Sequence, residues 1–513
     1  MKIRQLFLLV IFLLSYAPIF AQVDTAWVRR YNGPGNSNEG AYDLAVDING
    51  NVYVTGYTFN QFDLDYATVK YSPDGDTLWV RHYAGLASGN DIPYALALDD
   101  SGNVVVTGIS GFDYATIKYA PDGDTVWVRR YNGPVNGLDE AHALTVDEGG
   151  NVYVTGHSTG NLTSFDYATV KYAPNGDTLW VRRFNGSGNN HDYGTAVAVD
   201  TGGNVYVTGY SWNDTSLFDY ATIKYSPDGD TLWVRYYKGS GNEYDQPEAL
   251  VVDHSGYVYL TGWSKGSGTS TDYATVKYAP DGDTVWVRRY SGPIFGLDEA
   301  YALDIDEAGN VYVTGSSWNG TNEDFVTIKY APDGDTLWIR RYNGQANEDD
   351  GAYDLSLDTS GNVYVAGYSW NGANYDYATI GYAPNGDTLW VRHYNGPGDG
   401  SDVGYALKAD ASGNVYVTGY SNGAGTGDDY ATIKYVQFTC IAKAGDVTGD
   451  GAVLLPDIVA IINFLFRSGP APTPLCRGDA NGNGTVLLPD IVYLINFIFK
   501  SGPAPVKTGQ CCL

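Results

Sequence analysis

The sequence predicts an all-β fold, an eight-bladed β-propeller of four-stranded blades, followed by a small all-α calcium-binding domain. Two observations lead to this prediction. The string D-T-x-W recurs eight times at spacings of 48 to 53 residues, and two nearly identical Asp-rich loops stand near the C-terminus. A repeat near this length that contains four short strands is typical of a propeller blade. The tryptophans of the repeat are Trp27, Trp79, Trp127, Trp180, Trp233, Trp286, Trp338 and Trp390.

Three further segments recur in each repeat and bring the number of strands per repeat to four. One ends in Asp, as at residues 44–47; one reads V-Y-V-T-G, as at 52–56; one reads D-Y-A-T-V-K-Y, as at 65–71. These runs alternate and are rich in Val, Tyr, Thr and Trp, which is the pattern of short strands. The turns between them read D-x-x-G-N and P-D-G-D or P-N-G-D, where Pro presets φ and Gly supplies a positive φ.

The two ends of the repeat region predict how the ring closes. The region begins with an isolated fourth strand at residues 24–31, whereas the eighth repeat lacks a fourth strand of its own. We expect the N-terminal strand to complete the last blade, because this removes two open sheet edges. The predicted propeller spans residues 22–435.

Residues 24–435 resemble the bacterial β-propeller repeat (SBBP-type) family, whose units carry the same V-Y-V-T-G and D-G-D-T-x-W strings. The resemblance implies the propeller fold and a secreted setting. It implies no particular activity.

The N-terminus has the pattern of an export signal. Lys2 and Arg4 precede an apolar stretch at residues 6–20, which ends in Ala21-Gln22. This predicts a cleaved signal peptide at residues 1–21 and a secreted protein, either free or attached to the cell surface. The alternative is a membrane anchor, but Ser15, Tyr16 and Pro18 interrupt the short apolar run. We expect no membrane span in the mature chain.

The charge balance excludes one class of partner. Acidic residues outnumber basic ones 59 to 30, for a formal net charge of −29. A field of this sign repels phosphate backbones, so we expect no nucleic-acid partner.

Two C-terminal segments, residues 445–472 and 478–505, are identical at 20 of 28 positions. Each opens with oxygen ligands at loop positions 1, 3, 5 and 12, with a backbone carbonyl at 7 and Gly at 6, which is a calcium-loop pattern. The sequence therefore predicts two Ca²⁺ ions. The predicted ligands are Asp446, Thr448, Asp450, the Ala452 carbonyl and Asp457 in the first loop, and Asp479, Asn481, Asn483, the Thr485 carbonyl and Asp490 in the second.

Each loop leads into an apolar helix, predicted at residues 457–467 and 490–500 and closed by Ser-Gly-Pro. This duplicated layout, with Asp at position 12, resembles a type I dockerin module, assigned to residues 445–513 after a linker at 436–444. The resemblance implies docking onto a cohesin-like protein partner. The partner-contacting positions 10 and 11 of that family fall here on Leu455-Pro456 and Leu488-Pro489.

All four cysteines lie near this module: Cys440, Cys476, Cys511 and Cys512. Export permits disulfides here, and a bond that joins the two ends of the module is one arrangement. The spacing leaves all three connectivities open.

An acid stands eight residues before the first-strand Asp in every repeat. One interpretation is a crown of carboxylates that binds a cation or sugar hydroxyls; the favoured one is that each acid accepts backbone N–H groups at the blade entry. The eight acids are Glu39, Asp91, Asp139, Asp192, Asp245, Asp298, Asp350 and Asp402. We expect the recurring Arg after each W-V or W-I, and the recurring Lys of the third strand, to pair with nearby Asp.

The connections between strands two and three, and between blades, vary, and in a propeller they share one face. Variable loops on a rigid scaffold favour binding, and flat indole rings stack on sugars. The alternative is that these rings cover neighbouring loops. The candidate ligand-binding residues on this face are Phe59, Trp212, Trp263, Trp318 and Trp370.

The sequence thus predicts a secreted, non-catalytic binding or scaffold propeller, with a glycan or protein ligand on its variable face and a calcium-dependent tether. The six histidines are scattered over the repeats, and no catalytic residue is predicted. The alternative is an accessory or catalytic component of an extracellular polysaccharide-degrading system that acts by O-glycosyl hydrolysis. A third is a structural surface-layer or adhesion protein.

Overall fold

The computed structural model describes residues 22–85, 89–213, 217–241, 243–268, 270–438, 442–450, 452–472, 477–481, 485–506 and 511–512. The predicted signal peptide lies outside the described residues. The chain divides into two compact units, one formed by Thr25–Val436 and the other containing Gln437–Leu513. In the part of the chain that the structure describes, no helix combines the length and the apolar character needed to cross a membrane.

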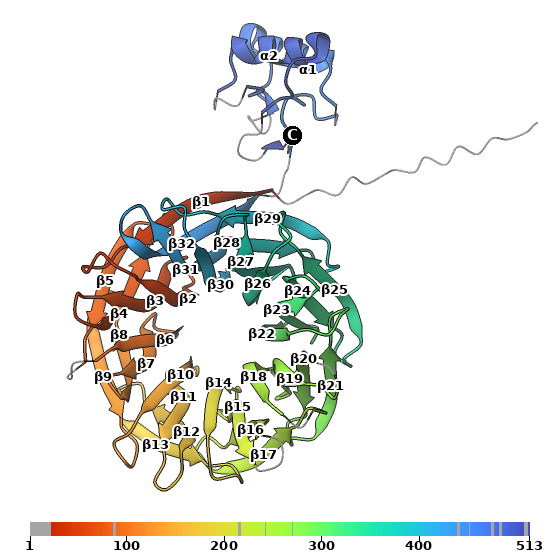
Figure 1. The fold of residues 1–513 in the computed structure, drawn as a ribbon. Coiled ribbons are helices and arrows are strands. Elements are labelled where there is room, and N and C mark those ends of the chain that lie inside the picture. Colours follow the sequence, from red (N-terminus) through yellow and green to blue (C-terminus); the bar gives the residue numbers. More distant parts are fainter. Residues whose placement is uncertain are drawn as a thin grey trace, which may run out of the picture. The chain divides into compact units, whose positions relative to one another are not determined.

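The first unit is an eight-bladed β-propeller, and each blade is an antiparallel four-stranded sheet (Figure 1). The innermost strands are β2 (Gly40–Val46), β6 (Asp91–Leu98), β10 (Asp139–Val146), β14 (Asp192–Val199), β18 (Asp245–Val252), β22 (Asp298–Ile305), β26 (Asp350–Leu357) and β30 (Asp402–Ala409). The second strands are β3 (Val52–Phe59), β7 (Val104–Ser110), β11 (Val152–Thr159), β15 (Val205–Asn213), β19 (Val258–Lys265), β23 (Val311–Trp318), β27 (Val363–Trp370) and β31 (Val415–Gly423).

The third strands are β4 (Leu64–Tyr71), β8 (Asp113–Tyr119), β12 (Phe165–Tyr172), β16 (Leu217–Tyr225), β20 (Thr271–Tyr278), β24 (Glu323–Tyr330), β28 (Tyr375–Tyr382) and β32 (Gly427–Phe438). The outer strands are β5 (Thr77–Tyr83), β9 (Thr125–Tyr131), β13 (Thr178–Phe184), β17 (Thr231–Tyr237), β21 (Thr284–Tyr290), β25 (Thr336–Tyr342), β29 (Thr388–Tyr394) and β1 (Gln22–Tyr31). The eighth sheet has the order β1-β32-β31-β30, so the N-terminal strand completes the last blade, and the closure prediction is confirmed.

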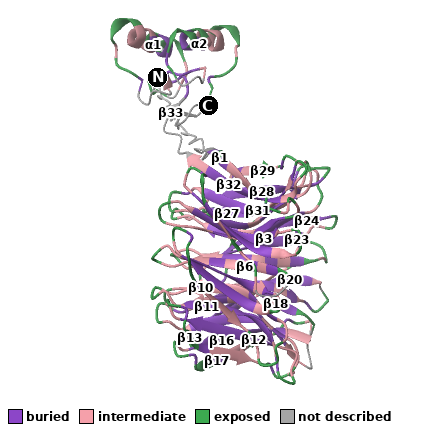
Figure 2. Ribbon diagram, turned by 90° about the vertical axis from the view of Figure 1, so that its left-hand side faces the viewer, coloured by how far each residue is buried: buried purple, intermediate pink, exposed green. Residues whose placement is uncertain are grey.

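The core lies between neighbouring blades, where the second and third strands are buried (Figure 2). One cluster joins Val52 and Val54 of the first blade with Trp27, Tyr416 and Tyr430 of the eighth blade. The same grouping recurs around the ring, because every repeat places Val and Tyr at these strand positions. The propeller is therefore held mainly by one kind of interface, which recurs in seven clusters around the ring.

In seven blades the repeated tryptophan and arginine bond the outer strand to the next blade. Trp79 Nε1 donates to the Pro121 carbonyl at 3.1 Å, and Arg81 Nε donates to the Gly123 carbonyl at 2.7 Å. The expectation that this Arg pairs with Asp is wrong, because the adjacent proline-glycine turn offers it backbone carbonyls instead. It is the following residue, as at Arg130, that forms an ion pair with an Asp, here Asp113 at 3.0 Å.

In most blades the recurring Lys also donates to a backbone carbonyl of the next blade. Lys70 Nζ donates to the same Pro121 carbonyl at 2.8 Å, and Lys329 donates to that of Pro384 at 3.2 Å. Lys118 pairs with Asp99 at 2.7 Å, and Lys329 also lies within ion-pair distance of Asp306, at 3.8 Å. The expected Lys–Asp pairing therefore describes only part of the set.

Each innermost strand carries one β-bulge, which inserts an extra residue against the second strand. In the first blade the register shifts between Ala41 and Asp43, so that Tyr42 is the extra residue. The equivalent residues of the other blades are Tyr94, His142, Thr195, Glu248, Tyr301, Tyr353 and Tyr405. We call these eight the bulge residues. A bulge re-aims a side chain, and it does so at the inner edge of every blade.

The second unit contains two helices, α1 (Leu455–Arg467) and α2 (Leu488–Lys500), and two short strands, β33 (Ala442–Lys443) and β34 (Cys511–Cys512). Ile458, Ile461, Ile491 and Leu494 form its core. Both helices begin two residues earlier than predicted, because a proline in the first turn needs no N–H partner. The parallel pairing of β33 with β34 joins the two ends of the unit. Cys440 and Cys476 lie outside the described residues, and the disulfide clasp stays a prediction.

Candidate functional site: the inner rim of the propeller and the C-terminal loops

The acids at the blade entries accept hydrogen bonds from backbone N–H groups of the fold. Asp192 is fully buried and accepts the Gly186 N–H at 2.8 Å; Asp402 accepts the N–H groups of Gly396 at 2.7 Å and Asn422 at 2.9 Å. Burial raises the pKa of Glu39 to about 7 and that of Asp192 to about 6. The favoured interpretation, acids that bond backbone N–H groups, is confirmed, because side chains turned into the blade entry do not form an open crown.

The predicted ligand-binding aromatics are spread over five blades and are all half-buried. Among the described residues, no ring contact joins any two of Phe59, Trp212, Trp263, Trp318 and Trp370. Trp318 lies against the entry loop of its own blade, where a Cβ on Gly296 would come within 2.3 Å of the indole. Trp212 lies in the same way against Gly188. These contacts support the alternative that the rings cover neighbouring loops.

Trp263 differs from the other four, because it lies at the inner rim. It pairs with Gln246 across the first two strands of the fifth blade, beside the bulge residue Glu248. Gln246 Nε2 donates to the Glu248 carboxylate at 2.7 Å, and the Trp263 side chain bonds it as well. The pKa of Glu248 is raised to about 7, mainly by burial and in part by the charge of Glu299 in the next blade.

Five of the bulge residues, all tyrosines, form an aromatic belt that sequence reasoning missed. Tyr42 contacts Tyr94 at 5.9 Å and Tyr405 at 5.8 Å between ring centroids, and Tyr353 contacts Tyr301 and Tyr405 in the same way. The belt thus runs through five consecutive blades. A signal was present, since these residues all stand five positions before the Asp that ends the first strand. The bulge that turns them toward one another is not visible in the alternation.

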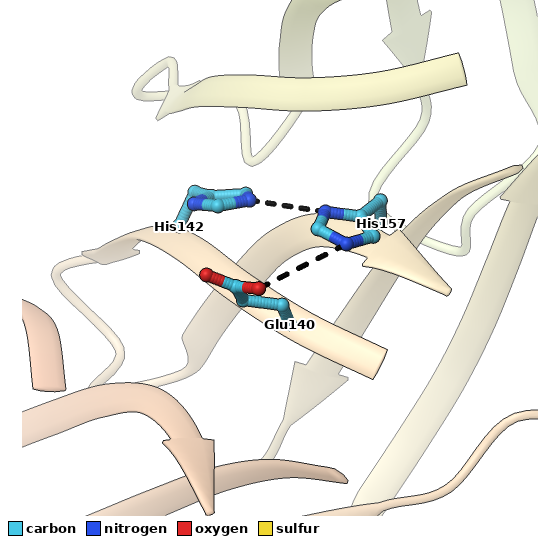
Figure 3. A group of neighbouring side chains, drawn as sticks. All are labelled: Glu140, His142 and His157. Carbon is cyan, nitrogen blue, oxygen red and sulfur yellow. Dashed lines mark hydrogen bonds and ion pairs between the residues drawn. The ribbon is translucent and has the colours of Figure 1, made fainter. Parts of the chain in front are cut away.

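The belt changes character in the third blade, where the bulge residue is His142. Its ring contacts Tyr94 at 5.6 Å and His157 at 5.1 Å, and its Nε2 lies 3.0 Å from Nδ1 of His157 (Figure 3). Glu140 Oε2 lies 4.0 Å from Nε2 of His157. The pKa of His157 is lowered to about 3, mainly by burial and in part by the charges of His142 and His191. Two of the six histidines, His142 and His157, are therefore in contact, although the histidines looked scattered in the sequence.

In the C-terminal loops, as at the blade entries, buried carboxylates accept backbone N–H groups. Asp457 Oδ1 accepts the Thr448 N–H at 2.9 Å, and Asp490 Oδ1 accepts the Asn481 N–H at 3.1 Å. Both position-12 carboxylates are fully buried, and among the described residues neither has an ion-pair partner. Burial of an unpaired carboxylate is costly, and the donor set around each loop is all oxygen, so these residues fit a hard cation such as Ca²⁺. Asn483 lies outside the described residues.

The predicted docking residues are exposed. Leu455 and Leu488 expose 54% and 57% of their surface, and Pro456 and Pro489 beside them are exposed too. They occupy the first turns of α1 and α2, and not the loops as the sequence suggested. Val459 and Val492, one turn further on, extend each patch. The module therefore presents two equivalent apolar patches.

Comparison with known proteins supports the fold. The family model described as "Beta-propeller repeat" matches five segments, residues 26–63, 126–163, 179–215, 285–322 and 337–376. A search of curated proteins gave no match. The segments resembling a dockerin are not among those matched.

Among solved structures, Sqt1 of Chaetomium thermophilum is similar at a TM-score of 0.53 and 11% identity, with 80% of this chain and 98% of that chain covered. Sqt1 bound to the N-terminus of ribosomal protein L10 gives 0.52 and 10%, covering 80% and 99%. A gluconolactonase of Xanthomonas campestris gives 0.32 and 12%, covering 67% and 86%, which is too weak a likeness to bear on function. At these identities the likeness shows the fold alone.

Proposed function

We propose that the chain is a secreted, non-catalytic binding or scaffold propeller, tethered to a protein partner through a calcium-dependent dockerin-like module. The observation that carries this proposal is a division within each blade. Residues that bond one blade to the next, such as Trp79 and Arg81, repeat around the ring, whereas residues at the inner rim differ from blade to blade. A constant frame with a variable rim is the arrangement of a binding scaffold.

The propeller's ligand is a glycan or a protein segment. Half-buried Tyr and Trp rings supply flat apolar surface with polar edges, which suits both classes. Sqt1, which shares the fold, was solved with the N-terminus of L10 bound. This shows that a propeller can hold a peptide, and only by analogy of fold does it support the same for this chain.

Calcium would be held by Asp446, Thr448, Asp450, the Ala452 carbonyl and Asp457 in the first loop. In the second loop it would be held by Asp479, Asn481, Asn483, the Thr485 carbonyl and Asp490. The ion would neutralise the buried carboxylates and fix the loops against α1 and α2. A module of this size has a small core and depends on such metals for stability.

The two exposed patches at Leu455-Pro456 and Leu488-Pro489 are the proposed contacts with a cohesin-like partner. Because the patches are equivalent, we expect either one to suffice. The test is a pull-down from the secretome of the source organism by the mature chain, with calcium or with a chelator. A partner retained only with calcium supports the tether. It should survive Leu455→Asp with Pro456→Asp, and equally the change at Leu488 and Pro489, but be lost when both patches are changed.

One observation favours the alternative, a component of a polysaccharide-degrading system. Burial raises the pKa of Glu248, and the charge of Glu299 adds to this rise. A carboxyl group with a raised pKa near a second carboxylate is the arrangement that glycoside hydrolases use. The test is release of reducing sugar from a panel of plant and microbial glycans. Activity that is lost in Glu248→Gln would favour this function over the scaffold.

A further inference from the structure

Glu140, His142 and His157 bring three metal-ligating side chains together in the third blade (Figure 3). Strand pairing places Glu140 of β10 directly opposite His157 of β11, and the bulge at His142 turns that ring toward the same point. One ligand atom from each residue lies within 4.8 Å of the other two. Their convergence results from the register of the strands.

The other seven blades act as internal controls for this trio. The position of His142 holds Tyr in five of them, and the position of His157 holds Tyr in four. Glu recurs at the position of Glu140 only in the sixth blade, where Tyr301 and Ser316 take the places of the histidines. Since the same blade forms seven times without this combination, the fold does not require it.

The surroundings hold the ligands in place. The His157 ring is 5% exposed and packs edge-on against Phe165 at 4.7 Å and Tyr193 at 4.9 Å. The Tyr94 hydroxyl bonds the Glu140 carboxylate, which orients it as outer partners of metal ligands do. Among the described residues, no Lys or Arg forms an ion pair with Glu140. The carboxylate thus stands beside two imidazoles without a fixed cation.

We propose that Glu140, His142 and His157 form a binding site for a divalent transition-metal ion of the Zn²⁺ class. Two imidazole nitrogens and one carboxylate oxygen are a ligand set that suits Zn²⁺ and not Ca²⁺. Two nitrogens on one tetrahedral ion lie roughly 3.3 Å apart for bonds of about 2.0 Å. The separation of 3.0 Å between His142 Nε2 and His157 Nδ1 is close to this.

Three protein ligands leave a fourth position open. Glu140 and His142 are half-buried at the inner rim, so this position is accessible to water or to an oxygen of a bound molecule. The site differs in ligand type, in ion and in location from the C-terminal loops, and it depends on neither calcium nor the proposed docking.

The test is zinc binding by the metal-free mature chain, measured by titration calorimetry in excess Ca²⁺ so that the C-terminal loops are occupied. The variants are His142→Tyr and His157→Tyr, since other blades carry Tyr at both positions. The control is His82→Arg, because five other blades carry Arg there. We expect one Zn²⁺ per chain, at least about tenfold weaker binding in each Tyr variant, none in the double variant, and no change in the control.

X-ray absorption at the zinc edge of the wild-type chain reads the ligands directly and does not depend on any variant. Two imidazoles with additional oxygen support the proposal. An all-oxygen or sulfur-containing shell overturns it, because the ion would then lie elsewhere. Absence of zinc binding by the wild type, or equal binding by the double variant, overturns it as well and leaves the two imidazoles as a hydrogen-bonded pair.

Discussion

Glu39 illustrates how a single buried carboxyl group links the fold to pH. Its side chain is fully buried at the entry of the first blade and accepts the backbone N–H of Gly33. Burial raises its pKa to about 7, whereas an unfolded Glu titrates near 4.3. Between these two values the folded chain holds a proton that the unfolded chain has released. The free energy of unfolding therefore falls as pH rises through this window.

We expect Glu39→Gln to flatten this dependence. A neutral amide keeps an acceptor for the backbone but has no charge to bury, so the variant should lose less stability than the wild type between pH 5 and 7. The difference in slope should approach about 1.4 kcal/mol per pH unit, the value for one proton. Tryptophan fluorescence during denaturation measures it for the propeller alone, because all 12 tryptophans lie there. Parallel slopes would contradict the assignment.

Gly381 marks the one interface in which the Lys is missing. In six other blades the Lys at this position donates to a proline carbonyl of the next blade. The eighth blade has no such turn, because its outer strand comes from the N-terminus. Trp390 accordingly has a buried Nε1 without a hydrogen-bond acceptor, and its ring stacks on Tyr364 at 5.7 Å and 22°. The exception in the repeat thus follows from the way the ring closes.

Restoring the consensus residue there should be harmful. A Cβ on Gly381 would lie 2.8 Å from the Trp390 ring, and the ammonium group would have no proline carbonyl to bond. We expect Gly381→Lys to lower the free energy of unfolding by about 1–3 kcal/mol. Thermal melting measures this effect. Thr388→Lys, at an exposed position of β29, is the matched control and should melt as the wild type does.

At the scale of strands and helices, repetition made the fold predictable. The sequence of each strand recurs eight times, so the alternation and the turn residues, such as Pro73 and Gly75, can be compared across the copies. The number of copies gives the number of blades. The inner rim could not be predicted in this way. The contact between His142 and His157 depends on a bulge and on the register of β10 against β11. Neither is visible in a period-2 pattern, and so the residues that differ between blades looked scattered.

The two calcium loops differ in charge, and this predicts an order of binding. The first has three side-chain carboxylates, Asp446, Asp450 and Asp457, and the second has two, Asp479 and Asp490. We expect the first loop to bind Ca²⁺ more tightly, because affinity rises with the number of charged ligands. Arg477 opposes this, as it lies 3.7 Å from Asp446. Arg477→Gln should therefore tighten the first site further.

Titration calorimetry of the mature chain measures both sites. Asp457→Asn should remove the tighter event and Asp490→Asn the weaker one. At a free concentration of 100 times its Kd, each bound ion adds about 2.7 kcal/mol to the free energy of unfolding. The melting temperature of the module should therefore fall when a chelator removes the calcium. The reverse order in the two variants would contradict the charge argument.

At the scale of the whole molecule, ring closure ties the two ends of the propeller together. β1 comes from the N-terminus and pairs with β32, so the eighth blade is the one sheet built from both ends of the unit. Arg30 of β1 forms an ion pair with Asp429 of β32 at 2.8 Å and also bonds Ser421. Trp27 of the same strand bonds Pro73 of the first blade at 3.0 Å. One strand therefore completes a sheet and also joins two blades.

Removal of this strand should open the ring and not merely shorten it. A chain that begins at Asn32 leaves β32 as an exposed edge and deprives the first blade of its partner Trp27. Because unpaired edges recruit other strands, we expect aggregation and a lower melting temperature. A synthetic peptide of residues 22–31 should add to the open edge and restore solubility and melting, whereas the same peptide with Trp27→Ala and Arg30→Ala should do so poorly. Size-exclusion chromatography and thermal melting measure both effects. A truncated chain that stays monomeric and melts like the wild type would show that seven complete blades and an open eighth suffice.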